Sequence, residues 1–524
     1  MFQEMGGMKL EKAEKVSTSM FEKLLYHNQF VLGPFFIEEL ASWKRIKINS
    51  SMHLNVHPDL NTYQAVYENK SITLLGFILD PDNPQASDSD IINGLIHKLS
   101  NCDTFFELTY DFGGRWILIV NDAKEIRLFN DATGLRQVFY TETHVTKDLW
   151  CASQPSIIAQ LLSLKMDKDA VDFINSYEFR KNKEFRFPCD SSPYKEIKHL
   201  LPNHYLNLET GLCKRYWPNK PFQNLPLEEG LEKSSKILKA LMKSASNRFD
   251  LAVGLTAGLD SRLVLAASKE ISNKISYITV RQIDMPDNYP DIIIPSTLLS
   301  KLGLKHDVVK SSFIINDEFV NIFKKNVTLP HYIYAPDAYA ILAYYCQSKV
   351  AVTGSVSEIA RWPFRSRLPR SHWKKVTAYD LSPLYYMGKS QFAIKHVENW
   401  LSRLGEIYNL DVLDLFAWEQ AFGTWLAMCQ LEFDIAWKDI FTPYNCRNLL
   451  ISMLSVEEKY RRPPKYILYE KVILKLWPEV LSVPINPHKK KRFNSLMKSY
   501  ITLYVPDSIK NSLKRILKLG AKDA

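Results

Sequence analysis

The chain has 524 residues, of which 46% are apolar, and a formal net charge of +10. This length and apolar content can bury two or three hydrophobic cores, so two domains are the simplest expectation. No apolar run approaches the roughly 18 residues of a membrane span, and the first residues lack a signal-peptide core. We therefore expect a cytoplasmic protein without a membrane span.

Short apolar runs dominate the first half of the chain. Those at 116–120, 126–129 and 137–140 are separated by turn residues, which predicts antiparallel strands. Seven cysteines occur at scattered positions without the spacing of a metal site. We expect them to be reduced thiols in the core.

The second half changes character after a segment at 218–226 that holds three prolines and is the expected linker. From residue 227 onward helical periodicity prevails, with strands expected at 251–255, 276–280 and 349–353. This alternation predicts a parallel sheet wrapped by helices. Ligands of such sheets bind at the carboxyl ends of the strands.

The strand at 251–255 breaks at a turn of small residues, Thr256, Ala257 and Gly258, before an apolar helix at 263–267. Backbone N–H groups in such a turn can approach phosphate oxygens, and the dipole of the following helix favours the same anion. Asp260 and Ser261 then hold Mg²⁺ and a phosphate oxygen. An ordinary strand–turn–helix explains this stretch equally well.

The phosphate-binding pattern G-x-x-x-x-G-K-[ST] is absent, so transfer of a γ-phosphate has no support. We expect cleavage between the α- and β-phosphates of ATP instead.

Part of the positive charge gathers near the end of the chain, at 488–493 and in an amphipathic helix expected at 507–519. A solvated helix edge is the simplest interpretation. Binding of a peptide, a membrane surface or nucleic acid is the alternative, but no RNA-reading motif accompanies the charge, and we expect no nucleic-acid partner.

Motifs over nearly the whole chain occur in one order. They are G-R-W-I-L-I-V at 114–120, N-D-A-T-G-L-R at 130–136, I-K-H-L-L-P-N-H at 197–204 and L-T-A-G-L-D-S at 255–261. Together they resemble the asparagine synthetase family, with relatives such as β-lactam synthetases and lasso-peptide cyclases. The last motif is similar to the family's S-G-G-x-D-S, with Thr256 and Ala257 in place of the serine and the first glycine.

The resemblance implies an α/β and α+β protein of two domains. Residues 1–217 would form a degenerate Ntn-type, glutaminase-like β-rich sandwich, and 218–226 the linker. Residues 227–524 would form a parallel α/β domain of the PP-loop (adenine nucleotide alpha hydrolase-like) type with a basic C-terminal helix. Glutamine hydrolysis in the family needs a cysteine at the mature N-terminus, whereas this chain begins Met1-Phe2 and its first cysteine is Cys102. We therefore expect an inactive glutaminase domain, and an interior Cys102 is a poor substitute.

By resemblance, Leu255, Val280 and Gly354 would surround the adenosine of ATP, and Thr353 would also belong to the ATP site. Three acids, Asp260, Asp291 and Glu358, would bind Mg²⁺. For Asp291, a helix N-cap or a first-turn acid is an equally good interpretation.

A second loop, T-G-S-V-S-E-I at 353–359, is similar to the family's S-G-E-G-x-D-E. Glu358 replaces its aspartate, Ile359 its final acid, and Ser355 stands where ammonia-using members place a glutamate. Serine is a poor general base at neutral pH, so another group or the substrate must deprotonate the attacking amine. This departure puts asparagine formation in doubt.

Near the end, P-K-Y-I-L-Y at 464–469 resembles the family's K-Y-I-L-R, and D-I-F-T-P-Y at 439–444 its R-x-P-F-L-D. Lys465 would then stabilise charge on the phosphates, joining Ser355 and Glu358 as a catalytic candidate. A surface lysine opening a helix is the alternative. Arg361 and Arg365 either contact an anionic substrate or are solvated.

The first hypothesis is an ATP-dependent amide-bond ligase that adenylates a small-molecule or peptide carboxylate and lets an amine displace AMP. Peptide or lactam closure, surface-sugar amidation and other natural-product biosynthesis fit equally well, and a homodimer is compatible with the sequence. The second hypothesis is a non-catalytic nucleotide-binding scaffold. A tRNA-modifying pyrophosphatase is a weaker third.

Overall fold

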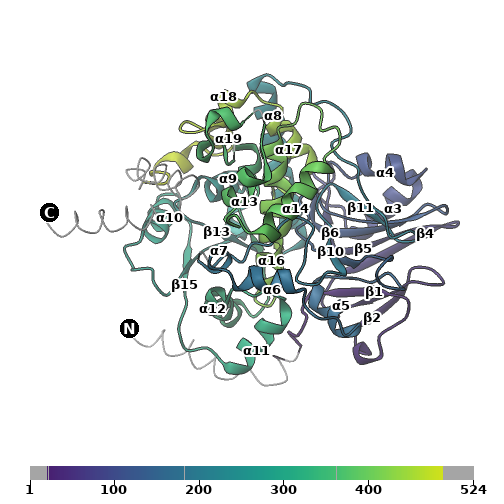
Figure 1. Ribbon diagram of the computed structural model, residues 1–524. Helices are drawn as coiled ribbons and strands as arrows, with labels where there is room; N and C mark the ends of the chain where they lie inside the picture. The colour runs from purple at the N-terminus through teal and green to yellow at the C-terminus, as the bar shows by residue number, and fades with distance from the viewer. Residues whose placement is uncertain (1–20, 22, 182, 362, 374, 488–524) are drawn as a thin grey trace.

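The computed structural model describes residues 21, 23–181, 183–361, 363–373 and 375–487, which fold into two halves around three sheets. In Figure 1 the strands of the first half gather at the right and the helices of the second half at the left. The basic stretches predicted at 488–493 and 507–519 lie outside the described residues. In the part of the chain that is described, every helix is too short or too polar to cross a membrane.

The first half contains two six-stranded antiparallel sheets. One sheet has the order β10 (Ile197–His199), β8 (Phe139–Thr141), β9 (Cys151–Ala152), β1 (Phe30–Gly33), β3 (His53–Val56) and β2 (Lys44–Lys47). The other has the order β12 (Cys213–Arg215), β11 (His204–Asn207), β7 (Ile126–Asn130), β6 (Gly113–Asn121), β5 (Lys70–Leu79) and β4 (Thr62–Tyr67).

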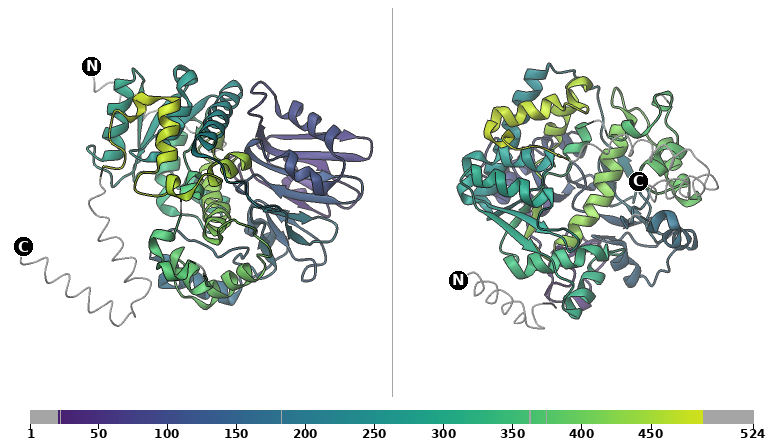
Figure 2. Two further views of the ribbon diagram at one scale, coloured as in Figure 1. Left: turned by 90° about the horizontal axis from the view of Figure 1, so that it is seen from above. Right: turned by 90° about the vertical axis from the view of Figure 1, so that its left-hand side faces the viewer.

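Alternating side chains of the long strands divide between two cores, as the period of a strand requires. Leu75 and Ile117 pack between the two sheets, whereas Leu74 and Leu118 face the helices outside. Helix α5 covers the outer face of the other sheet through Ile158. The result is a four-layer helix–sheet–sheet–helix sandwich, seen beside the second half in Figure 2. Its helices are α3 (Asp88–Lys98), α4 (Cys102–Leu108), α5 (Pro155–Leu161) and the 3-10 turn η1 (Glu38–Leu40). Helices α6 (Lys168–Asn175) and α7 (Tyr177–Arg180) also belong to this part of the sequence, but α6 packs on the second half, where Phe173 lies against Phe392.

The second half is built on a five-stranded parallel sheet. Its order is β15 (His306–Lys310), β14 (Ser276–Arg281), β13 (Leu251–Gly254), β16 (Val350–Val352) and β17 (Asp439–Phe441). The central strands are short apolar runs because helices cover both faces of a parallel sheet.

The helices of this half include a long one in three parts, in which the π-helical segment η7 (Ala417–Leu426) joins α15 (Val412–Phe416) to α16 (Ala427–Phe433). The other α-helices are α8 (Leu227–Arg248), α9 (Leu259–Ala267), α10 (Pro290–Lys301), α11 (Asp317–Asn326), α12 (Ala335–Tyr345), α13 (Ala378–Leu384), α14 (Gln391–Ser402), α17 (Arg447–Leu454), α18 (Glu458–Arg461) and α19 (Ile467–Leu476). Short 3-10 segments are η2 (Lys269–Lys274), η3 (Tyr332–Tyr334), η4 (Ser357–Arg361), η5 (Arg365–Arg367), η6 (Arg370–His372) and η8 (Pro478–Leu481).

The predicted strands are found, with shifted ends. The expected antiparallel runs are β6, β7 and β8, and the expected parallel strands are β13, β14 and β16. The sequence analysis missed β15 and β17, and it began the helix after the small-residue turn four residues late, because α9 starts at Leu259. The expected linker 218–226 holds no helix or ladder strand, only an isolated bridge from Leu225 to Val456. The division into domains at this segment stays a prediction.

The cysteines are unpaired, as expected, but not all lie in the core. Five are buried, whereas Cys213 is half-buried and Cys346 is exposed. Cys346 follows α12 with a φ of 50°, so the chain turns there at the surface. Cys102 is buried and its environment raises the pKa of its thiol, chiefly through desolvation, which disfavours it as a nucleophile.

A cluster of buried charges joins the two halves. Arg115 of β6 donates to Asp434, with Nη2 3.0 Å from Oδ2, and its Nη1 lies 3.2 Å from Oδ1 of Asp439. Arg136 donates from Nη2 to Oδ2 of Asp439 at 2.6 Å. All four residues are buried, so each charge depends on its partners for the solvation that water would give.

Replacing Arg115 with methionine removes the cation that pairs with both Asp434 and Asp439 in a buried site. We expect the free energy of unfolding to fall by about 3–5 kcal/mol, the range for removing one partner of a buried ion pair. Chemical denaturation measures it. The exposed pair of Lys220 and Glu107 provides a control, since Lys220→Met should cost at most about 1 kcal/mol. Equal losses in the two variants would contradict the assigned importance of the cluster.

Candidate functional site

The parallel sheet reverses its direction of growth between β13 and β16. From β13 the chain builds outward through β14 to β15, and then returns to the other side of β13 with β16 and β17. Such a switch point opens a crevice at the carboxyl ends of the strands, where open α/β sheets bind ligands. A cavity of about 640 Å³ elsewhere is larger, but the one at the switch point measures about 530 Å³, well within the range of small-molecule sites. We call it the sheet-end cavity.

Most of the residues predicted for the nucleotide site line this cavity. They are Leu255, Thr256, Asp260, Ser261, Val280, Asp291, Thr353, Gly354, Ser355 and Glu358. Four separate segments of the chain supply them, and the parallel pairing of β13, β14 and β16 brings those segments to one edge. Of the predicted set, Gly258 and Lys465 do not line it.

The turn after β13 is held by side-chain acceptors. The N–H of Thr256 donates to Oγ of Ser261 at 3.1 Å, and the N–H of Gly258 to Oγ1 of Thr256 at 3.0 Å. The N–H of Ala257 donates to Oδ1 of Asp291 at 2.8 Å. Asp291 lies in the first turn of α10. Three successive N–H groups therefore point to oxygen acceptors, one of them a carboxylate, which is the kind of group that an anion can replace.

The second loop packs directly on the first at Gly354. A Cβ atom at this position would lie 2.5 Å from the carbonyl carbon of Asp260 and 2.8 Å from the nitrogen of Ser261. Only glycine allows this approach of two backbones. The contact fixes the loop after β16 against the start of α9.

A guanidinium group binds the acid that the sequence assigns to magnesium. Nη2 of Arg361 lies 2.8 Å from Oδ1 and 2.9 Å from Oδ2 of Asp260, and the Ser357 hydroxyl donates to Oδ1. The same nitrogen is 3.4 Å from Oε1 of Glu358. The Arg361 side chain is 14% exposed and lies over the rings of two tyrosines, Tyr466 and Tyr469. Arg361 is therefore neither solvated nor free for a substrate in this structure.

Glu358 has an unusual protonation equilibrium for a glutamate. Desolvation of its carboxyl group and the charge of Asp260 raise its pKa to about 7, although Arg361 opposes the shift. The desolvation acts on the inner part of the group, because the side chain as a whole is 41% exposed. Its Oε2 is buried and has no hydrogen-bond partner among the described residues. A carboxyl group with a pKa near neutrality is suited to accept a proton during catalysis.

The donor set fits a nucleotide that arrives with magnesium. Asp260, Asp291 and Glu358 are the charged side chains among the described residues that line the cavity, and no lysine or arginine joins them there. A bare triphosphate would meet like charge, whereas a complex with Mg²⁺ would find carboxylate oxygens, the ligands that this ion prefers. Asp260 would have to share its oxygens with Arg361.

Lys465 lies elsewhere. It is exposed, just before α19, and lines a separate cavity of about 490 Å³ with Leu259 and Asn486. The N–H of Asn486 donates to the carbonyl of Ala257 at 2.9 Å, so the turn touches both cavities. The structure thus does not bring Lys465 to the acids of the sheet-end cavity.

Arg365 differs from both sequence interpretations. It is 5% exposed and donates from Nη1 to Oδ1 of Asp414 at 2.9 Å, and it also pairs with Asp411. Ile359, which stands in place of an acid of the family, is fully buried. Both positions serve the core of the second half.

Residues that sequence analysis missed form an aromatic wall of the cavity. Tyr334 precedes α12, and Trp425, Phe433 and Trp437 come from or follow the long helix. Helical periodicity predicts that such residues are buried but not which cavity they border, because that depends on how the helix crosses the sheet. The missed strand β17 contributes Ile440.

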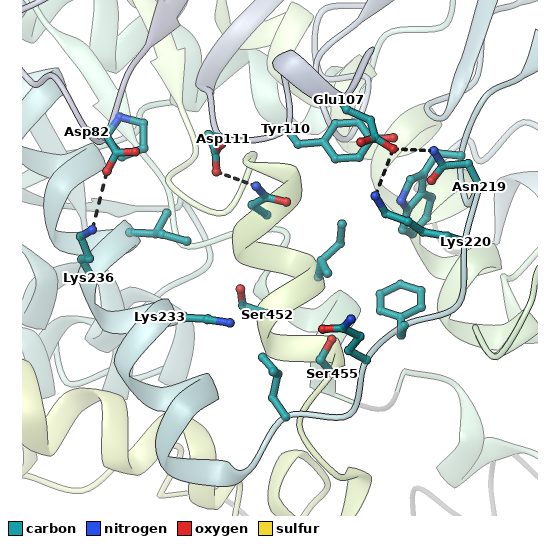
Figure 3. Close-up of a pocket in the computed structure, with 18 of the residues that line it drawn as sticks. Asp82, Glu107, Tyr110, Asp111, Asn219, Lys220, Lys233, Lys236, Ser452 and Ser455 are labelled. Atoms are coloured by element: carbon teal, nitrogen blue, oxygen red, sulfur yellow. Dashed lines mark hydrogen bonds and ion pairs between the residues drawn. The ribbon is translucent and has the colours of Figure 1, made fainter. Parts of the chain in front are cut away.

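The larger cavity of about 640 Å³ lies between the two halves. Figure 3 shows two ion pairs among its charged groups: Lys220 contacts Glu107 at 3.1 Å and Lys236 contacts Asp82 at 3.7 Å. None of the residues predicted for catalysis or ATP binding lines it. It therefore has no role in the chemistry argued below.

No family model matches the chain, and no curated protein matches it. Two solved structures are similar at 12% identity. One is described as the allosteric regulatory enzyme of purine biosynthesis; the match covers 56% of this chain and 71% of that chain, with a TM-score of 0.23. The other is a glutamine phosphoribosylpyrophosphate amidotransferase from B. subtilis complexed with ADP and GMP, with coverage of 54% and 66% and a TM-score of 0.21. Likeness this slight carries no argument about this chain.

Substituting alanine for Gly354 should force the two site loops apart, since its Cβ would meet the backbone of Asp260 at 2.5 Å. We expect a loss of about 1–3 kcal/mol in the free energy of unfolding, as overpacking typically gives. Gly94 of α3 is the control, because a Cβ there meets nothing within 4 Å and alanine should stabilise the helix by about 0.5–1 kcal/mol. A Gly354→Ala variant as stable as the wild type would refute the close approach.

The raised pKa of Glu358 makes stability depend on pH. Between its ordinary value of 4.5 and about 7 the folded state holds a proton that the unfolded state has lost, so this group's contribution to stability falls as pH rises. Glu358→Gln removes the titration. Denaturation at several pH values should show that the free energy of unfolding of the variant rises relative to that of the wild type between about pH 4.5 and 7. Asp287→Asn, at an exposed acid, serves as control, and a pH-independent difference for Glu358→Gln would contradict the assignment.

Proposed function

We propose that the chain is an ATP-dependent ligase that forms an amide bond through an acyl-adenylate. An oxygen of the substrate carboxylate attacks the α-phosphorus of ATP, and the bond to pyrophosphate breaks. An amine nitrogen then attacks the acyl carbon, AMP leaves, and the amine gives up a proton. The observation that carries the proposal is the convergence of ten predicted residues, all but Gly258 and Lys465, on one cavity at the switch point.

The turn at Thr256, Ala257 and Gly258 supports this assignment. Its N–H groups already donate to oxygens, and Ala257 would donate to a phosphate oxygen in place of Asp291. Asp291 would then be free to hold Mg²⁺ together with Asp260, which would share its oxygens with Arg361. The ion supplies charge neutralisation when bound. The apolar strand ends and the aromatic wall would give the reacting groups an apolar surrounding on those sides.

Glu358 is the strongest candidate for removing the proton from the amine. Ser355 cannot do so at neutral pH, whereas the pKa of Glu358 lies at about 7. Lys465 lies on the other side of the turn, at the separate cavity. Its charge would reach the phosphates only if the conformation of the turn changed.

The assignment to the asparagine synthetase family is part of this proposal. On it, the parallel half is a PP-loop domain and the four-layer sandwich is a glutaminase-like Ntn domain without its activity. The class of substrate stays open among natural products, peptide lactams and surface sugars, because no described residue selects among them.

One observation favours a second candidate, a nucleotide-binding scaffold without catalysis. Arg361 occupies the space between Asp260 and Glu358 where a magnesium ligand set needs free oxygens. If this ion pair is permanent, the cavity can hold a nucleoside but cannot align a triphosphate.

Exchange of radiolabelled pyrophosphate into ATP, with Mg²⁺ and a panel of carboxylates and peptides, tests the ligase. We expect exchange that depends on one class of carboxylate and falls roughly 10²–10³-fold in Asp260→Asn, the range for one preorganised charged group. Asp287→Asn should exchange like the wild type.

Binding measurements separate the remaining outcomes. Nucleotide binding without exchange across the panel, and without any effect of Asp260→Asn on binding, would favour the scaffold. No binding of ATP with or without Mg²⁺ would overturn both candidates.

A further inference from the structure

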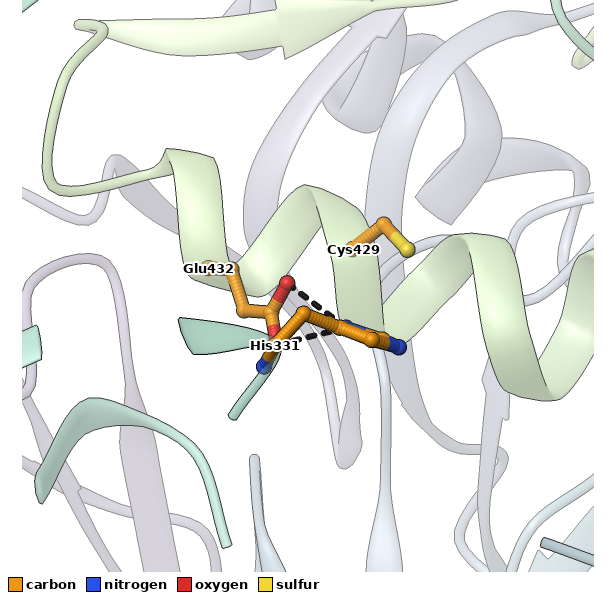
Figure 4. A group of neighbouring side chains, drawn as sticks. All are labelled: His331, Cys429 and Glu432. Carbon is orange, nitrogen blue, oxygen red and sulfur yellow. Dashed lines mark hydrogen bonds and ion pairs between the residues drawn. The ribbon is translucent and has the colours of Figure 1, made fainter. Parts of the chain in front are cut away.

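A second group of side chains with metal-binding chemistry lies beside the sheet-end cavity, which one of its members, Cys429, also lines. Cys429 and Glu432 are three residues apart on α16 and so share a face, and His331 approaches them from the segment before η3. Figure 4 shows the imidazole of His331 against the carboxylate of Glu432, with the Cys429 thiol on the neighbouring turn. One nitrogen, one sulfur and one oxygen of these residues lie within 4.8 Å of one another.

The geometry points to a site for one divalent cation of the zinc class, bound by Nδ1 of His331, Sγ of Cys429 and a carboxylate oxygen of Glu432. This site is independent of the proposed ligase activity. It uses none of the acids assigned to magnesium.

The imidazole is held as metal-binding histidines are held. Its Nε2 lies 2.8 Å from the backbone carbonyl oxygen of Glu184 and must donate there, which leaves Nδ1 to face Glu432. A carbonyl partner of this kind fixes the ring and its tautomer. The ring of Phe185 stacks on it at 5.3 Å and 11°, so the imidazole cannot turn away.

The carboxylate is oriented as well. Both oxygens of Glu432 lie 2.9 Å from Nδ1 of His331, and Oε1 also accepts the backbone N–H of His331 at 2.7 Å. Equal distances from one nitrogen to both oxygens are poor for a single directed hydrogen bond. In the absence of a metal, Nδ1 would carry a proton between the two oxygens, and His331 and Glu432 would form a buried ion pair.

The donor types select the class of metal. A thiolate, an imidazole and a carboxylate suit zinc and related borderline ions, whereas Mg²⁺ prefers oxygen alone. Three protein ligands leave a fourth position for water or a substrate. Since Cys429 also lines the sheet-end cavity, the proposed ion would border the space in which the substrate is expected.

Binding would exchange protons for the metal. The thiol of Cys429 loses its proton to become the sulfur ligand, and Nδ1 of His331 loses the proton that it shares with Glu432. The two positive charges of the ion replace these two protons, so the buried cluster keeps its net charge.

A second cluster, formed by Cys102, Asp122 and Glu125, lacks these properties. Asp122 accepts backbone N–H groups, among them that of Cys102 at 2.8 Å, and Glu125 pairs with Arg127. A metal there would break contacts that stabilise a turn. At His331 the imidazole and the carboxylate of Glu432 are bound to each other, so an ion between them would replace the proton on Nδ1.

Metal uptake by the full chain tests the site. After removal of bound metal with a chelator, we expect the wild type to take up one equivalent of Zn²⁺, measured by elemental analysis. With Co²⁺ it should show the charge-transfer absorption of a thiolate ligand. Cys429→Ser should abolish that absorption, and Glu432→Gln should weaken binding by more than the roughly 10–100-fold that loss of an outer-shell partner causes.

Cys151→Ser is the matched control, because Cys151 is an equally buried thiol in β9, and it should bind metal like the wild type. Circular dichroism of each variant shows whether it is folded, and the wild-type cobalt spectrum is informative without any variant. A folded wild type that takes up no metal, or a thiolate absorption that survives in Cys429→Ser, would overturn the proposal.

Discussion

The buried ion cluster of Arg115, Arg136, Asp434 and Asp439 is the constraint on which the cavity depends. Asp434 ends the long helix and Asp439 begins β17, so two arginines of the sandwich half hold both elements. Strand β17 in turn pairs with β16, whose carboxyl end carries the loop at Gly354. Because separating buried charges from their partners is costly, the ion cluster fixes the position of the cavity wall relative to the sandwich. The first half therefore has a structural role whether or not it has chemistry of its own.

Within the cavity, electrostatics decides what can bind. Three carboxylates line it, and no basic residue is among the described residues that line it. Arg361, outside this lining, forms ion pairs with two of them, Asp260 and Glu358. A guanidinium cannot move as freely as a hydrated ion, since Tyr466 and Tyr469 lie against it. Removing Arg361 from Asp260 would cost free energy that a magnesium–nucleotide complex must exceed. The affinity for nucleotide thus depends on a competition between two cations for one carboxylate.

The sequence allowed three strands of the parallel sheet to be predicted, and ten of the residues proposed for the site line one cavity at their ends. Their roles stay predictions. Apolar runs such as β13 and β16 are clear signals, and small residues such as Gly354 mark close backbone approach. Strand β17 was not predicted because three residues beginning with an aspartate show no strand pattern. The aspartate, Asp439, is buried there because it pairs with Arg115. Lys465 lines a different cavity from the acids, which the sequence could not indicate because local similarity does not say on which side of a turn a following helix lies. Contacts between residues some 300 positions apart, such as Arg115 with Asp434, have no local signal at all.

The position of α16 connects these features. Its end is fixed by Asp434, its cavity face carries Phe433 and Cys429, and Glu432 on it binds His331. Oxygen ligands therefore lie at the strand ends, and the sulfur of Cys429 reaches the same cavity from α16. Since the two donor sets prefer different ions, Mg²⁺ and a zinc-class ion would not compete for the same position. Because Cys429 lines the cavity and Glu432 binds His331, an ion at this site would connect the cavity wall at α16 to the segment before η3, a structural consequence that does not depend on the proposed ligase activity.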